Sequence, residues 1–266
     1  MTRPIRCWLT VVLPGFIALQ VPSLARAQIL ETETARPVGS GVLEVGSNFE
    51  YQVSSEGHEV ALPFALEYGL SDRLEFLVEP VAYTAIRPKV GSQATGFGDL
   101  ETTLTYLLRR ETSGSPALAF AGEVKFPTAR DRVIGTGKTD FAGYLIASKR
   151  FGRVDTHANL GYTIVGRPAG AQLKNIFNFA IAGELTLGSA SELYGEILAN
   201  TAASSAPDAS GPTPPGTTTS EAPSGEIVGS LGIARYVVPF LRLSLGVSVD
   251  NNGAVLFRPG FMIVRR

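Results

Sequence analysis

The residues with the clearest potential for nucleophilic chemistry surround His157, one of two histidines in the sequence. A serine nucleophile needs a base beside it and an acid that holds the base. His157, with Ser148 or Ser248 and with Asp155, supplies these three residue types. A single polar histidine on the wall of an aqueous interior is the simpler interpretation. We therefore expect no catalytic residue and keep lipid or peptide hydrolysis as an alternative.

Other motifs for ligand or cofactor binding fail on their spacing. Gly137-Lys138-Thr139 looks like the end of a phosphate-binding loop, but Arg132 stands where the first glycine is required. The single cysteine, Cys7, lies in a segment that we expect to be removed, so no thiolate remains for catalysis or for a metal. The sequence therefore predicts no cofactor and no metal site.

Charged side chains form a larger set, which shares one face of the predicted strands. Unpaired charge in a narrow interior is costly, so internal salt bridges are one interpretation. A polar, acid-rich passage that sets solute preference is the functional one, and the two are compatible. The candidate lumen-lining residues are Glu44, Glu50, Glu67, Glu75, Glu79, Asp99, Glu101, Glu123, Lys125, Arg150, His157, Glu184, Glu196, Arg242, Asp250 and Arg258.

The elements that must position these side chains are amphipathic β-strands. Apolar and polar residues alternate along Leu43–Val53 and along Val60–Leu70. Side chains of a strand point to opposite faces in turn, so a sustained period of two indicates a strand rather than a helix. The alternation recurs about twelve times, each time over roughly the 9–11 residues that a tilted strand needs to cross a bilayer.

The connections between these strands sort by length. Short ones near Ser71-Asp72, Phe151–Arg153 and Gly188–Ala190 alternate with longer ones such as Pro127–Lys138 and Thr201–Gly225. Outer-membrane barrels have short periplasmic turns and long outer loops. The predicted fold is all-β, a transmembrane antiparallel up-and-down β-barrel of about 12 strands over residues 42–266. A soluble β-sandwich or lipocalin-like barrel also alternates, but the small and acidic opposite face favours the membrane barrel.

Two features depart from an ideal barrel. Pro63, Pro80 and Pro259 fall inside predicted strands, where a closed barrel has no free edge to accommodate them, so we expect bulges or strand ends there. The chain ends in Arg265-Arg266, whereas outer-membrane barrels commonly end on an aromatic residue.

Residues 201–225 are rich in Ala, Ser, Thr, Pro and Gly and predict a low-complexity outer loop.

The first 27 residues have the pattern of a secretory signal peptide. Arg3 and Arg6 precede a mostly apolar run, and Ala25-Arg26-Ala27 supplies the small residues for cleavage before Gln28. After cleavage, 24 acidic residues face 20 basic ones, a net charge of −4, so no nucleic-acid partner is expected. Residues 28–41 are expected to be a periplasmic N-terminal segment, with folding into the lumen as a plug left open.

Several short motifs resemble one family of barrel proteins. They are Gly96-Phe97-Gly98-Asp99-Leu100 with Tyr106, Lys125-Phe126-Pro127-Thr128, Gly135-Thr136-Gly137 with Asp140, Lys149-Arg150-Phe151-Gly152, and Asn159-Leu160-Gly161-Tyr162. Together they resemble the outer-membrane family named for the meta pathway of phenol degradation, whose members are often described as transporters. Ala129, where that family frequently has glycine, is a small departure. The resemblance implies an outer-membrane barrel that passes small hydrophobic or aromatic compounds.

These observations predict a channel or transporter in the outer membrane of a Gram-negative bacterium. Its expected partners are outer-membrane lipid, a small-molecule solute and the barrel assembly machinery. The alternative is a structural or interaction barrel with a plugged lumen and functional outer loops. A barrel hydrolase that uses His157 is the third hypothesis.

Overall fold

The computed structural model describes residues 30–203 and 225–265, and every regular element within these ranges is a β-strand. The strands are β1 (Leu43–Asn48), β2 (Glu50–Val53), β3 (Gly57–Ser71), β4 (Leu74–Pro88), β5 (Ala94–Gly96), β6 (Leu100–Arg109), β7 (Ala117–Phe126), β8 (Asp140–Phe151), β9 (Val154–Ile164), β10 (Ile176–Leu187), β11 (Ser191–Asn200), β12 (Glu226–Val238), β13 (Leu241–Asp250) and β14 (Val255–Arg265). Within the described ranges, no helix is long and apolar enough to span a membrane. The expected signal peptide and all but the edges of the loop 201–225 lie outside the described residues.

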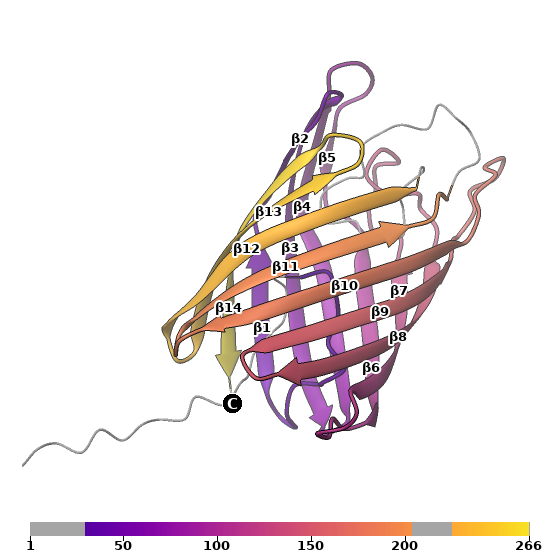
Figure 1. Cartoon of the computed structure of the whole chain (residues 1–266). Helices are drawn as coiled ribbons and strands as arrows, with labels where there is room; N and C mark the ends of the chain where they lie inside the picture. Colours follow the sequence, from indigo (N-terminus) through magenta and orange to yellow (C-terminus); the bar gives the residue numbers. More distant parts are fainter. Residues whose placement is uncertain (1–29, 204–224, 266) are drawn as a thin grey trace, which may run out of the picture.

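The strands close into one antiparallel barrel (Figure 1). β1 and β2 are two halves of one interrupted strand, since both pair with β3 and with β14. β5 and β6 likewise both pair with β4. The barrel wall therefore consists of twelve strands, two of which are interrupted. The pairing of β14 with β1, from Leu43↔Arg265 to Asn48↔Gly260, closes the barrel. This confirms the predicted fold class and strand number.

The outside of the barrel is apolar and its inside is polar. Large apolar side chains such as Ile181, Ile197 and Leu231 are 68%, 63% and 72% exposed, whereas Glu44 and Lys125 are 1% and 2% exposed. A soluble sandwich or lipocalin-like barrel would bury its apolar face instead. This orientation is the one that a strand facing lipid on one side and an aqueous interior on the other requires.

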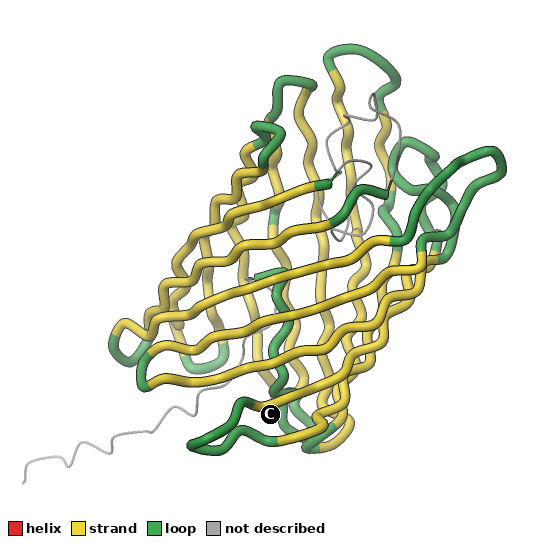
Figure 2. Tube along the Cα trace, turned by 45° about the vertical axis from the view of Figure 1, so that its right-hand side comes forward, coloured by secondary structure: helices red, strands yellow, loops and turns green. Residues whose placement is uncertain are grey.

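The two ends of the barrel differ in their connections (Figure 2). Two residues link β3 to β4, β8 to β9 and β12 to β13, all at the end where the described chain finishes. Gly152 and Gly188 have φ of 60° and 82° in the turns at this end, values that glycine adopts at little steric cost. The opposite end has the longer loops, including residues 127–139 and 165–175. We call these the periplasmic and outer ends.

The three strand prolines lie where the sheet is irregular. Pro63 follows a register shift between β3 and β4. Pro80 pairs with Leu100 at the start of β6, next to the break that separates β5 from β6. Pro259 lies opposite the break between β1 and β2, where its carbonyl accepts the N–H of Phe49 at 2.8 Å. Each proline therefore coincides with an interruption of the ladder, as expected for a residue that cannot donate a backbone hydrogen bond.

Candidate functional site

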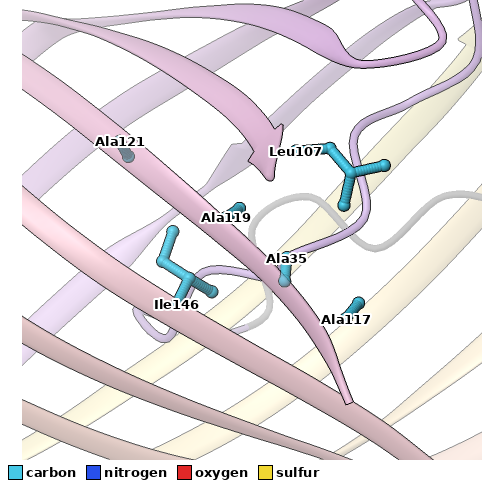
Figure 3. Packing of buried hydrophobic residues seen from close by; sticks show 6 residues of the cluster. All are labelled: Ala35, Leu107, Ala117, Ala119, Ala121 and Ile146. Carbon is cyan, nitrogen blue, oxygen red and sulfur yellow. The ribbon is translucent and has the colours of Figure 1, made fainter. Parts of the chain in front are cut away.

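Residues 30–41, here called the N-terminal segment, occupy the interior of the barrel (Figure 2). Ala35 is fully buried against Leu107 of β6, Ala119 of β7 and Ile146 of β8 (Figure 3). The small side chains on the inner face of β7 leave the space that the segment fills. Of the two locations left open by the sequence, the described residues take the lumen. The expectation of a segment that hangs in the periplasm is therefore wrong for this part.

The backbone of the N-terminal segment is held by side chains of the wall. Glu196 accepts both the backbone N–H and the hydroxyl of Thr32 at 2.6 Å. Ser148 Oγ accepts the N–H of Ala35 at 2.8 Å, and Glu75 accepts the N–H of Val38 at 2.5 Å. An irregular segment inside a barrel has no strand partner, so polar wall side chains must satisfy its backbone groups. Some interior carboxylates thus serve as acceptors for the segment.

An ion-pair cluster fixes the segment near the periplasmic end. The Arg36 guanidinium contacts Asp155 Oδ1 at 3.1 Å and Glu111 Oε2 at 2.5 Å. Arg150 reaches the same Asp155 at 2.7 Å, and Lys149 reaches Glu111 at 3.3 Å. Partial burial acts in the opposite direction, but the hydrogen bonds from Arg36 and Arg150 lower the pKa of Glu111 below its ordinary value. Glu111 lies in the connection between β6 and β7 and was not among the candidates.

His157 and Ser148 meet, but they do not form a catalytic triad. His157 Nδ1 lies 2.8 Å from Ser148 Oγ. His157 Nε2 is 3.8 Å from Glu184 and 4.0 Å from Asp155, ion-pair distances rather than hydrogen bonds. Ser148 is 1% exposed and receives the Ala35 N–H, so the segment covers the hydroxyl that would attack a substrate. This geometry assigns the pair to holding the N-terminal segment.

Two arginines cross the interior near the closure of the barrel. Arg258 of β14 contacts Glu50 at 2.9 Å and also pairs with Glu31 of the N-terminal segment. Arg242 of β13 contacts Glu192 at 2.5 Å. The predicted salt-bridge network therefore exists, and it links the segment to the wall through Arg258 as well as through Arg36.

A second cluster organises the outer end of the lumen. Lys125 lies 2.9 Å from Asp140 and 3.7 Å from Asp99, and all three side chains are buried. Asp99 accepts the N–H of Ala129 at 2.8 Å, while the Thr128 hydroxyl donates to the Gly98 carbonyl at 3.0 Å. The motif residues around Gly98, Asp99, Lys125 and Thr128 therefore share one task. They hold the loop 127–139 against β4 and β5, where Ile134 packs on Ile86 and Ala94.

A cavity of about 100 Å³ remains between the N-terminal segment and the wall. Residues 30–34 form one side, and β3, β4, β6, β7, β8, β9, β10 and β11 contribute the others. Burial inside the barrel, followed by the charges of Glu75 and Glu123, raises the pKa of Glu33 to about 8. The lumen is thus narrowed to an acid-rich cavity by a segment that belongs to the same chain.

The predicted lumen residues fall into four groups in the structure. Around the N-terminal segment lie Glu67, Glu75, Glu79, Glu123, His157, Glu184 and Glu196. Asp99, Glu101 and Lys125 lie toward the outer end, Arg150 lies near the periplasmic end, and Glu44, Glu50, Arg242 and Arg258 lie near the closing strands. Asp250 differs, because it accepts the N–H groups of Asn252 and Ala254 and so shapes the β13–β14 turn. Its place on the lumen wall stays a prediction.

Sequence reasoning also missed several buried acids. Glu59 and Glu226 are 3% and 7% exposed but were not selected, because the predicted strands began one residue or more too late. Asp140 was named only as part of a short motif and Asp155 only as a possible triad acid, and neither was among the candidate lumen-lining residues. Their significance comes from Lys125 and Arg36, whose proximity no sequence pattern reveals.

Solved structures with this fold are outer-membrane barrels. A COG4313 outer membrane channel from Pseudomonas putida F1 superposes with a TM-score of 0.64 at 11% identity, covering 89% of this chain and all of that one. The NanC porin gives 0.58 at 10% identity, with coverage of 83% and 98%. The KdgM porin in complex with disordered oligogalacturonate gives 0.53 at 7% identity, with coverage of 82% and 98%. At these identities the likeness concerns the fold alone.

The sequence itself gives the more specific relationship. No curated protein matches it. A family model described as "Putative MetA-pathway of phenol degradation" matches residues 31–220, which is more than half of the chain. The match spans the N-terminal segment, the Arg36 cluster and the outer-end cluster. The resemblance noted from the short motifs is confirmed, and the chain belongs to this family.

Proposed function

We propose that this protein is an outer-membrane channel for small solutes, and that its own N-terminal segment closes it. The observation that carries the proposal is the position of residues 30–41 inside a barrel whose wall is polar. The apolar outer surface would face outer-membrane lipid, and the barrel assembly machinery would insert it after signal-peptide cleavage. The family description supports small aromatic molecules among the solutes.

The nature of the contacts supports a closure that can be reversed. The wall holds the segment through hydrogen bonds and ion pairs to single side chains, and not through a strand added to the sheet. Each such contact stabilises by only about 0.5–3 kcal/mol in net terms, because water replaces it on release. A few of them can therefore hold the segment and still let it leave.

Conductance in planar bilayers tests the proposal. The mature chain should show low or intermittent conductance, and a variant lacking residues 28–41 should show a larger, steady one. A variant with Asp72→Asn, an exposed carboxylate in the β3–β4 turn, serves as a control for insertion and should behave like the mature chain. Silence of both the mature chain and the deletion variant would contradict a channel.

A sealed structural barrel is the second candidate, and the number of contacts that Glu196, Ser148, Asp155 and Arg258 make with the segment favours it. In that case the outer loops would carry the function. Deleting residues 201–225 would then abolish activity and leave the barrel folded. We infer that the chain is not a hydrolase, because Ser148 is engaged with the segment. If the mature chain hydrolyses lipid or peptide and a His157→Ala variant does not, the inference that the chain is not a hydrolase is contradicted.

A further inference from the structure

The cavity beside the N-terminal segment has an excess of acidic groups. The described residues that line it include six carboxylates and no lysine or arginine: Glu31, Glu33, Glu67, Glu79, Glu123 and Glu184. Arg258 pairs with Glu31. The ion pairs of Lys125 with Asp140, of Arg242 with Glu192 and of Arg36 with Asp155 involve acids that do not line the cavity.

The carboxylates in and around the cavity are close enough to disfavour one another's ionisation. The pKa of Glu33 is raised because burial and neighbouring carboxylates both disfavour its charged form. A positive group in the cavity would relieve this repulsion and would permit ionisation.

A second, independent feature of the cavity is a hydrogen-bond donor. The Thr163 hydroxyl donates to Asn178 Oδ1 at 3.0 Å, and Asn178 Nδ2 donates to Asn200 Oδ1 at 3.0 Å. This chain of hydrogen bonds ends at Asn200, which lines the cavity and is 7% exposed. Among the described residues, none accepts a hydrogen bond from Asn200 Nδ2. A buried amide donor without an acceptor is unfavourable, so an oxygen at this position would stabilise the site.

We propose that this cavity binds a small organic cation that also carries an oxygen acceptor. Its ammonium group would lie among Glu33, Glu79 and Glu123, and its oxygen would accept from Asn200 Nδ2. The inference rests on the proposed channel function, because it names a solute class for the same lumen. A volume of about 100 Å³ suits a molecule of a few non-hydrogen atoms, such as an amino alcohol.

Binding and closure are coupled in this arrangement. Residues 30–34 supply part of the cavity, so the complete site exists only when the N-terminal segment is in place. A ligand that binds only the docked form stabilises that form by mass action. The cation should therefore increase the protection of the segment from hydrogen exchange.

Three two-carbon probes of similar size separate charge from shape: ethanolamine, neutral ethylene glycol and anionic glycolate. Titration calorimetry of the mature barrel in detergent at neutral pH should show binding of ethanolamine, with the other two about tenfold weaker or undetectable. Glu123→Gln, and separately Asn200→Leu, should weaken ethanolamine binding by about tenfold, the loss expected for one charge-assisted or buried hydrogen bond. Asp72→Asn should leave it unchanged.

Glu33→Gln provides a second test if a wall variant fails to fold, because Glu33 belongs to no strand. Equal binding of ethanolamine and ethylene glycol, or no binding of ethanolamine, would overturn the inference. The two proposals can fail separately. If the barrel conducts but does not bind ethanolamine, only the inference about the cation site is contradicted. If the barrel binds ethanolamine but never conducts, even without residues 28–41, only the channel proposal is contradicted.

Discussion

Arg36 of the N-terminal segment donates to both carboxylate oxygens of Asp155 on β9, at 3.1 and 3.2 Å. Arg150 shares this acid from the neighbouring strand, so Asp155 keeps a positive partner if the segment leaves. Release of the N-terminal segment therefore does not leave Asp155 as a buried, unpaired negative charge. Such a charge would otherwise be the main energetic cost of opening the channel.

Arg36→Ala should shift the segment toward its released state. The lost hydrogen bonds join charged groups, but they are partly exposed, so we expect a change of about 1–2 kcal/mol, roughly tenfold in the docking equilibrium. The measurement is hydrogen exchange of residues 30–41 together with mean conductance. Arg73→Ala, which removes an exposed arginine in the β3–β4 turn, should change neither. Unchanged exchange in the Arg36 variant would show that the pair does not hold the segment.

Docking of the segment should weaken as pH rises. Glu33 has a pKa of about 8 when docked and an ordinary value of 4.5 when released. Below pH 4.5 both forms are protonated and docking is strongest. Between 4.5 and 8 the released form ionises first, so docking loses up to about 1.4 kcal/mol per pH unit from this group, and above 8 the loss is complete. Conductance should rise across this window.

Glu33→Gln removes this titration, and its conductance should therefore depend less on pH between 4.5 and 8. Glu56→Gln changes a carboxylate in the β2–β3 loop and should retain the pH profile of the mature chain. A Glu33→Gln profile as steep as that of the mature chain would mean that other groups set the response.

Lys125→Met should destabilise the barrel, because Asp99 and Asp140 would remain buried without their positive partner. Breaking a buried ion pair from one side costs about 3–5 kcal/mol. Urea unfolding followed by heat-modifiable gel migration measures the loss. The triple variant Lys125→Met, Asp99→Asn, Asp140→Asn removes the charges together and should recover much of the stability. No recovery would indicate that the amine is needed for packing instead.

Gly232→Ala should also destabilise the barrel, through a clash. A Cβ at Gly232 would lie 2.1 Å from the ring of Tyr194, which rests on β12 inside the barrel. Displacing that ring costs about 1–3 kcal/mol. Gly229→Ala, three residues earlier in the same strand, meets nothing within 4 Å and is the matched control. If both variants unfold at the same urea concentration, Tyr194 moves without cost.

The fold was predictable from the sequence, whereas the closure of the lumen was not. Alternation along Val60–Leu70 identifies a strand because each residue reports its own environment, apolar toward lipid and polar toward the interior. The position of Ala35 against β7 depends on which wall residues are small and on acceptors such as Ser148 and Glu196, which are more than 110 residues away in sequence. No local pattern encodes such contacts.

The same limit explains what the prediction of the site left out. Asp250 follows the alternation of β13, and its carboxylate also accepts a hydrogen bond from the turn that follows it. Glu59 and Glu226 were missed because strands extend beyond the bilayer-spanning length on which the expectation was based. The motif around Asp99 and Lys125 was recognised as a family resemblance, and the structure gives it a physical role at the outer end.

A reversible tether between the segment and the wall tests the central claim most directly. Thr34 Oγ1 and Ser148 Oγ are 3.4 Å apart, so a Thr34→Cys, Ser148→Cys variant places two thiols within reach of a disulfide. The chain's single cysteine, Cys7, falls in the expected signal peptide and would not interfere. In a planar bilayer the oxidised variant should be closed, and reductant should restore the conductance of the mature chain. Equal conductance before and after reduction would contradict closure by the N-terminal segment.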